Sequence, residues 1–295
     1  MGKRIRLIIN GKSAANATLR QLIEQSRSHG HEVSVRATFE EGDAERFAKE
    51  ALGQGLDSIV AVGGDGTLNE VLQGMLAKGK PVEAMGLLPM GTANDFAHGV
   101  GISADNLHKA MAIILNKAPR PIDVGMVNGR AFLNVVTGGF GSQVTVETNP
   151  DLKRVLGKFS YLLTGIGKLF DFQPIAVELK NGDASWQGEL MALAVGNGWQ
   201  AGGGIRLCPD ACLDDGLLDI TLLPHNERVG LLDMLDALAQ DGLQGHEAWV
   251  KRRQAAEFEL IAEAPLHINL DGEPMKDTHF RFSVLKQQLS FHLPE

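Results

Sequence analysis

The first 120 residues alternate between two patterns of hydrophobic positions. Short apolar runs of strand length are followed by longer stretches in which apolar residues recur every three or four positions, the spacing of an amphipathic helix. The pattern predicts strands over 3–9, 32–36, 57–62 and 84–88, and helices over 18–28, 43–52, 68–77 and 106–116. This alternation predicts an α/β domain, in which helices cover both faces of a parallel sheet.

The pattern changes near Pro119-Arg120-Pro121, which predicts a domain boundary. Beyond it, strands are expected over 122–127, 131–137, 175–179, 186–195, 216–223, 258–261, 266–270, 280–285 and 289–293, with a helix over 227–239. Asn128-Gly129, between the first two strands, is typical of a β-hairpin. We therefore expect an N-terminal α/β domain over 1–120 and a mainly β domain over 121–286, either a sandwich or an open barrel.

Residues 145–172 interrupt the run of strands. An amphipathic helix is expected there, with an apolar face made of Tyr161, Leu162, Leu163, Ile166, Leu169 and Phe170. Packing of that face onto the sheet is the favoured interpretation, and contact with a membrane or lipid is the alternative.

The predicted strand 57–62 ends in the turn Gly63-Gly64-Asp65-Gly66-Thr67. Thr67 and Glu70 have capping-box spacing, which predicts Thr67 as the N-cap of the next helix. Free N–H groups, glycines without a Cβ and the helix dipole favour an anion, so we expect the turn to bind nucleotide phosphates. A tight turn without a ligand is the alternative. Asp65 favours the ligand, because a carboxylate near phosphates needs a metal ion or a transferable proton.

Two more polar segments follow predicted strands, namely Thr38 and the loop Gly91-Thr92-Ala93-Asn94-Asp95. Loops at the carboxyl ends of parallel strands share one edge of the sheet. Thr38, the 63–67 turn and the 91–95 loop are therefore expected to converge. Ordinary helix capping is the alternative for the 91–95 loop.

In the β domain, Leu270-Asp271-Gly272-Glu273-Pro274 places two carboxylates on a tight turn. Taken alone, a β-turn explains these residues. In a functional interpretation, one acid removes the proton from a hydroxyl group that attacks a phosphate. The Gly- and Asp-rich stretch 202–216 is either a solvated loop or a site for a hard cation, bound by an Asp carboxylate and backbone carbonyls.

The composition limits which kinds of partner the protein can bind and indicates its cellular compartment. The 28 Lys and Arg against 36 Asp and Glu give a net charge of −8, which argues against nucleic acid as the main partner. The basic run 251–253 is interpreted as a solvated strand, with phospholipid head groups as the alternative partner. No apolar run is long enough for a signal peptide core or a membrane span, so a cytoplasmic protein is expected. Cys208 and Cys212 are expected to be reduced structural thiols.

Two stretches, Gly63 to Glu70 and Pro89 to Phe96, resemble the catalytic domain of the diacylglycerol and sphingosine kinase family. Four later stretches extend the resemblance, to the bacterial YegS-type lipid kinases over nearly the whole chain: 137–141, 197–204, 215–218 and 270–274. The first stretch alone is shared with NAD kinases, whereas the ordered set is specific.

The resemblance implies an N-terminal α/β domain, a C-terminal β domain and a nucleotide in the cleft between them. It also implies that the last residues, about 287–295, return to the N-terminal domain. The nucleotide-contacting positions carry over to Thr38, Gly64, Asp65, Gly66, Thr67, Leu68, Asn69, Glu70 and Thr92, and Gly63 begins the same turn. The proton acceptor carries over to Glu273, with Asp271 beside it as the alternative. A divalent-ion site carries over to the Asp215 side chain and to the backbone carbonyls of Cys212 and Leu217.

These observations predict an ATP-dependent lipid kinase that requires Mg²⁺, with Ca²⁺ as an alternative at the acidic loop. Asp65 would lie close to the phosphate-bound magnesium. The expected acceptor is a lipid hydroxyl, phosphatidylglycerol first and diacylglycerol second, reached through transient peripheral contact with a membrane. Phosphorylation of NAD is one alternative function. A nucleotide- or metal-regulated binding protein without turnover is the other.

Overall fold

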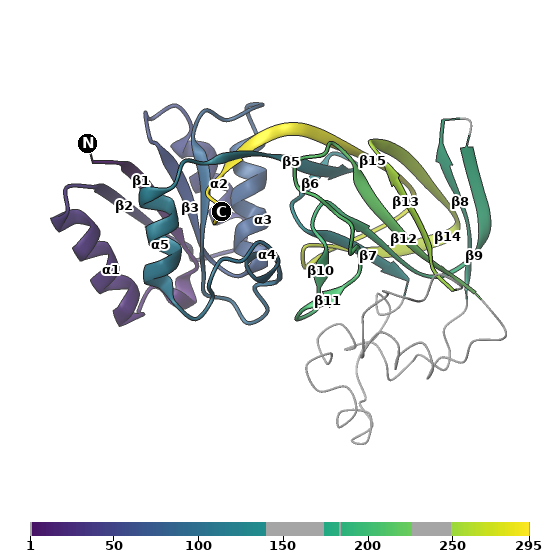
Figure 1. The fold of residues 1–295 in the computed structure, drawn as a ribbon, viewed down its shortest axis with the longest axis horizontal. Coiled ribbons are helices and arrows are strands. Elements are labelled where there is room, and N and C mark those ends of the chain that lie inside the picture. Colours follow the sequence, from purple (N-terminus) through teal and green to yellow (C-terminus); the bar gives the residue numbers. More distant parts are fainter. Residues whose placement is uncertain (1, 140–173, 183, 226–248, 295) are drawn as a thin grey trace, which may run out of the picture. The chain divides into compact units, whose positions relative to one another are not determined.

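The computed structural model describes residues 2–139, 174–182, 184–225 and 249–294 (Figure 1). The chain divides into two compact units: a first unit, Met1–Val124 with Lys286–Glu295, and a second unit, Gly125–Leu285. The helices expected over 227–239 and within 145–172 lie outside the described residues.

Four parallel strands in the order β4-β3-β1-β2 form the sheet of the first unit. Their bounds are β1 (Arg4–Ile9), β2 (Glu32–Ala37), β3 (Ser58–Gly63) and β4 (Ala84–Pro89). Every residue of β3 and β4 is buried, because a parallel sheet is covered on both faces. This burial explains why the strands appear in the sequence as continuous apolar runs.

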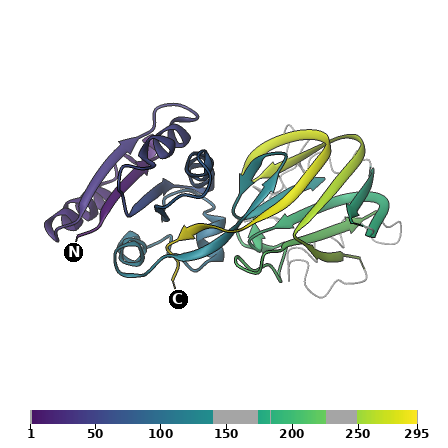
Figure 2. The ribbon, with the colours of Figure 1, turned by 90° about the horizontal axis from the view of Figure 1, so that it is seen from above.

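Helices cover both faces of this sheet. Their bounds are α1 (Ala17–Ser28), α2 (Asp43–Ala51), α3 (Asp65–Leu76), α4 (Asp95–Gly99) and α5 (Leu107–Asn116), with a short 3₁₀ helix η1 (Gly11–Ser13). α1 and α5 contact each other on one face, and α2 and α3 on the other (Figure 2). The predicted α/β alternation is confirmed, with most helix and strand ends within two residues of the expected positions.

The last residues of the chain pack into the first unit. The backbone N–H of His292 donates to the Met85 carbonyl of β4 at 2.9 Å, and its Nε2 lies 2.9 Å from Ser58 Oγ. Phe291 is fully buried, and its ring meets that of Phe96 edge-on with centroids 5.3 Å apart. A segment that is distant in sequence, 234 residues from Ser58 to His292, therefore completes the core of this unit.

The second unit is an antiparallel β sandwich. Its strands are β5 (Arg120–Val127), β6 (Arg130–Phe132), β7 (Val135–Gly139), β8 (Ile175–Asn181), β9 (Ala184–Gly196), β10 (Gln200–Ala201), β11 (Ile205–Arg206), β12 (Leu218–Pro224), β13 (Lys251–Ala255), β14 (Glu257–Leu270) and β15 (Glu273–Phe291). β5 and β15 each continue into the first unit. Both β7 and β8 pair with β9 and with β14, and these strands enclose the larger of two buried hydrophobic clusters found among the described residues of this unit. The predicted hairpin at Asn128-Gly129 joins β5 to β6, and both turn residues have positive φ.

Five predicted strands, at three places in the chain, have different limits in the structure. The strand expected over 131–137 is divided into β6 and β7 at Leu133-Asn134. β14 is one strand rather than two, because it continues through the exposed residues 263–265 with a shift in its pairing register. β15 likewise continues through 286–288. Exposed residues interrupted the apolar pattern without ending the hydrogen-bonded strand.

Candidate active site

Loops at the carboxyl ends of the four parallel strands lie together in the first unit. The Met90 N–H donates to the Gly63 carbonyl at 2.8 Å, which joins the loops after β3 and β4. The Thr38 hydroxyl accepts from the Gly11 N–H at 3.1 Å, which joins the loops after β2 and β1. Asn10 Nδ2 donates to Thr67 Oγ1 at 3.3 Å and so connects the two pairs. The predicted convergence is confirmed. The loop that contains Asn10 was not expected at this edge. It could have been predicted, because it directly follows a parallel strand, as the other loops do.

The helix after the glycine turn starts earlier than expected. α3 begins at Asp65 with Gly64 as its N-cap, and no side chain in the described part of the chain caps it. The capping-box prediction is therefore wrong. Thr67 is the third residue of the helix, and the Glu70 carboxylate instead accepts from the Ala44 N–H at the start of α2, at 3.2 Å. Glycine serves as an N-cap residue, and the uncapped N–H groups that result suit phosphate oxygens.

Asp65 ties the glycine turn to the next loop. Its Oδ2 accepts from the Asp95 N–H and its Oδ1 from the Phe96 N–H, both at 3.1 Å. These bonds cap α4, whose N-cap residue Asn94 instead bonds the Gly91 backbone through its side chain at 2.8 and 2.9 Å. A carboxylate offers about four lone-pair sites, so Asp65 retains acceptor capacity for a cation. Its oxygens are also the ligands that Mg²⁺ prefers.

The backbones of the two loops approach so closely that both need glycine. A Cβ on Gly91 would lie 2.4 Å from the Gly64 Cα, and a Cβ on Gly64 would lie 3.0 Å from the Gly91 Cα. The fixed contact holds the start of α3 against the 91–95 loop. Thr92 lies exposed in that loop, and Thr38 is half-buried in the loop after β2.

Three of the predicted nucleotide-contacting residues turn their side chains elsewhere. Leu68 and Asn69 are buried, and Asn69 Oδ1 accepts from Gln73 Nε2 at 3.1 Å. The Glu70 carboxylate bonds the backbone at the start of α2. These three side chains are buried or form bonds within or between helices, which leaves Thr38, Gly63 to Thr67 and Thr92 as the members of the set at this edge of the sheet.

The two acids of the 270–274 turn, in the second unit, have different surroundings. Asp271 has φ 46°, and its carboxylate accepts from the backbone N–H groups of Leu133, Asn134 and Val135 at 2.8, 3.1 and 3.0 Å. Glu273 is half-buried at the start of β15, and its carboxylate has no hydrogen-bond partner among the residues that the structure describes. Asp271 is thus occupied with the backbone, whereas Glu273 remains available for a substrate.

The acidic loop before β12 offers oxygen donors but no assembled cluster of side chains. Asp215 is exposed, and its Oδ1 accepts from the Leu217 N–H at 2.9 Å. No group of three or more His, Cys, Asp or Glu side chains comes within metal-binding reach in the described ranges. A carboxylate with backbone carbonyls remains a chemically suitable donor set for Mg²⁺ or Ca²⁺.

Near this loop, the pKa values of the two thiols and of one carboxyl group are raised. Cys208 and Cys212 are free, as expected, and burial raises the pKa of the Cys208 thiol to about 12. Burial also raises the pKa of Asp219 to about 6, against an opposing hydrogen bond from Gln254. Cys208 is therefore an inert core residue.

Comparison with known proteins agrees with this fold. Residues 4–127 match the family model of the diacylglycerol kinase catalytic domain, and residues 134–292 match that of the YegS C-terminal NAD kinase beta sandwich-like domain. These two matches define a two-domain kinase of the diacylglycerol kinase class. Specifically, the chain belongs to the YegS-like lipid kinase family.

Full-length relatives support the assignment. A probable lipid kinase YegS-like from Pseudomonas aeruginosa strain UCBPP-PA14 is 45% identical over 99% of this chain and 94% of that protein. A probable lipid kinase YegS-like from Alcanivorax borkumensis is 39% identical over 100% of this chain and 98% of that protein. The crystal structure of a putative diacylglycerol kinase from Bacillus anthracis has the same fold, with a TM-score of 0.83 and 24% identity. The match covers 99% of this chain and 98% of that chain. Within the described residues, no helix is both long enough and apolar enough to cross a membrane.

Proposed function

We propose that this lipid kinase transfers the γ-phosphate of ATP to a lipid hydroxyl, with phosphatidylglycerol as the first candidate acceptor and diacylglycerol as the second. The observation that carries the nucleotide site is the uncapped start of α3, held against the 91–95 loop by the Gly64–Gly91 contact. Phosphoryl transfer depends mainly on positioning and on neutralising charge, and this rigid edge of N–H groups is suited to both.

The residues take distinct roles in this proposal. The backbone of Gly64 to Thr67 and the Thr92 hydroxyl bind phosphate oxygens, and Asp65 holds Mg²⁺. The ion, when bound, neutralises charge on the transferred phosphoryl group. Glu273 accepts the proton of the lipid hydroxyl. Asp271 acts as a positioning residue, because the 133–135 backbone already occupies both of its oxygens.

A second divalent ion is proposed at the acidic loop. Asp215 would bind it through its carboxylate, and Cys212 and Leu217 through their carbonyls. The cysteine at position 212 does not weaken this assignment, because only its backbone oxygen would bind.

The decisive experiment measures ATP turnover with purified acceptors and Mg²⁺ for wild type, Glu273→Gln and Glu263→Gln. Glu263 is an exposed acid of β14 and serves as the matched control. Loss of the proton acceptor should lower kcat by about 100-fold or more while KM for ATP changes little. Wild-type rates from Glu273→Gln would overturn its role. Phosphatidylglycerol, diacylglycerol and NAD in parallel reactions identify the acceptor, and formation of NADP without lipid phosphorylation would overturn the lipid assignment.

A further inference from the structure

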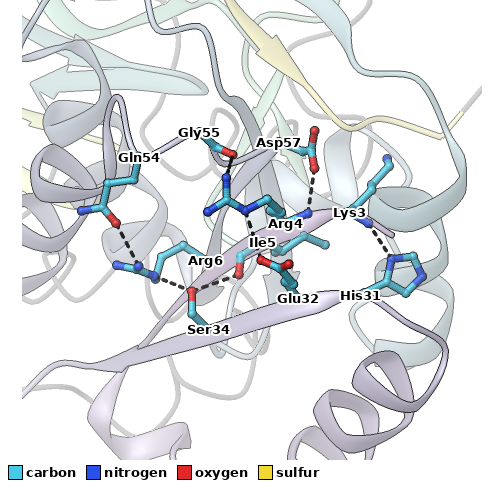
Figure 3. A network of polar contacts seen from close by, with 10 residues as sticks. All are labelled: Lys3, Arg4, Ile5, Arg6, His31, Glu32, Ser34, Gln54, Gly55 and Asp57. Carbon is cyan, nitrogen blue, oxygen red and sulfur yellow. Dashed lines mark hydrogen bonds and ion pairs between the residues drawn. The ribbon is translucent and has the colours of Figure 1, made fainter. Parts of the chain in front are cut away.

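A second candidate binding site lies at the opposite edge of the first unit's sheet, where β1 and β2 begin. A pocket of about 380 Å³ is lined there by charged and polar residues from the starts of β1 and β2, from α1 and from the loop before β3. The side chains that matter are Arg4, Arg6, Arg27, Glu32, Ser34 and Gln54 (most are shown in Figure 3). The nucleotide loops follow β3 and β4 and lie at the opposite, carboxyl-terminal end of the same parallel sheet.

The strand register places this charge on one face. Arg4 and Arg6 are two residues apart on β1, so both side chains project from the same side of the sheet. Their direct neighbours on β2 are Glu32 and Ser34. Three arginines therefore face one glutamate, in a chain whose net charge is −8.

Arg6 is the unusual member of this group. It is only 9% exposed, and its guanidinium donates to two neutral groups, Ser34 Oγ at 2.6 Å and Gln54 Oε1 at 3.2 Å (Figure 3). No carboxylate of the described residues lies within 4.0 Å of it. Burial and the nearby Arg36 lower the pKa of Arg6, and the more distant Glu50 carboxylate opposes that shift without contacting the guanidinium. A buried cation without an anionic partner is costly, and the cost falls when an anion binds.

The other two arginines also keep donors free. Arg4 uses Nε for Glu32 at 3.1 Å and Nη1 for the Gly55 carbonyl at 2.7 Å. Arg27 uses Nε and Nη2 for the Val33 carbonyl at 3.0 and 2.7 Å. Within the described part of the chain, Arg4 Nη2, Arg6 Nη1 and Arg27 Nη1 each have no hydrogen-bond partner. Three fixed guanidinium groups thus present unused N–H donors around one pocket.

We propose that this pocket binds a phosphate-class oxyanion carried by a small organic group, either a water-soluble phosphomonoester or the head group of a phosphorylated lipid. Guanidinium groups match phosphate oxygens in geometry and charge. The volume falls in the range of small-molecule sites, which is more room than a bare phosphate needs. The proposal is independent of the nucleotide site, because the two sites lie at opposite ends of the sheet.

The test titrates glycerol 3-phosphate into the full-length protein by calorimetry, with a non-hydrolysable ATP analogue and Mg²⁺ present to occupy the nucleotide site. Arg6→Gln and Arg27→Gln should each weaken binding by about tenfold or more. Arg20→Gln removes the same charge from an exposed position of α1 and should leave binding unchanged. If Arg6→Gln does not fold, Arg27→Gln decides, since that side chain is exposed.

A second arm distinguishes the two sources of phosphate. The same proteins are sedimented with phosphatidylcholine vesicles that contain phosphatidic acid. If glycerol 3-phosphate binding in the calorimeter depends on Arg6 and Arg27, the pocket is a site for water-soluble phosphomonoesters. If only vesicle binding depends on these two arginines, the pocket binds a lipid head group. Binding that is absent from both arms, or equal in all variants, overturns the proposal.

Discussion

At the scale of single residues, Asp271 and Glu273 show how two neighbouring acids can have separate tasks. The three N–H groups that donate to Asp271 belong to the residues between β6 and β7 and to the first residue of β7, up to 138 residues away in sequence. No sequence pattern connects such distant positions, so the sequence alone indicated a carboxylate pair. The structure separates a carboxylate that orders the backbone from one that is available for chemistry.

Replacing Asp271 by Ala should destabilise the protein, because three backbone donors lose their charged acceptor. We expect the free energy of unfolding to fall by about 3 kcal/mol, measured by urea denaturation. Glu263→Ala, at an exposed position, is the control and should change stability little. Glu273→Gln should likewise keep wild-type stability. A stable Asp271→Ala protein would show that these bonds contribute little to folding.

Asp219 predicts a pH dependence of stability. Its pKa is raised to about 6 from an ordinary value of 3.8, so the folded state favours the protonated acid. The stabilising effect is complete below about pH 4 and is lost as the pH rises to about 6. Relative to Asp219→Asn, wild type should therefore lose stability across this range, as measured by thermal unfolding at each pH. A constant difference between the two proteins would contradict the shifted pKa.

At the scale of elements, the close contact of Gly64 with Gly91 holds the loops after β3 and β4 together. Gly91→Ala should force the loops apart and lower affinity for a fluorescent ATP analogue by about tenfold or more, because small displacements of binding groups are costly. Gly101→Ala is the control. This alanine has a positive φ, unlike one at position 91, but only the Pro294 side chain lies near its Cβ, so nucleotide affinity should be unchanged. Equal affinity in both variants would show that the loops tolerate separation.

The elements also show how far the sequence predicted the structure. Apolar periodicity located the strands and helices of the first unit, because a sheet covered on both faces has a strong pattern. The sequence pattern predicted the start of α3 wrongly, because two N-cap candidates lie close together. Thr67 has capping-box spacing to Glu70, but Gly64 is the N-cap in the structure. The apolar pattern also divided β14 and β15, because exposed central residues interrupt it although each is a single strand. The converging loops followed from strand order, whereas the roles of Asp65 and Asp271 depended on tertiary contacts.

At the scale of the whole molecule, the first unit is built from two separate parts of the chain. Residues 1–124 expressed alone lack the segment that pairs with β4 and contributes Phe291 to the core. We expect this fragment to be much less stable than the same unit in the intact protein, by about 3–5 kcal/mol from loss of the Phe291 side chain alone. A peptide of residues 286–295 added in trans should raise its thermal midpoint.

A peptide in which Phe291 is replaced by Ala is the matched control for that experiment. It keeps the backbone that pairs with Met85 but not the buried ring, and should give little increase in the thermal midpoint. A fragment whose stability the wild-type peptide does not change would show that the first unit folds without its C-terminal segment.

The position of Phe291 also sets an order of events during protein synthesis. The ribosome makes the whole second unit before it makes residues 286–295, which complete the core of the first unit. Until then the β4 side of the nascent sheet lacks a neighbour, although its other strands have already been translated. A nascent chain in this state exposes an unpaired strand, so this kinase should be most prone to aggregation, and most dependent on chaperones, in the interval before its last residues emerge.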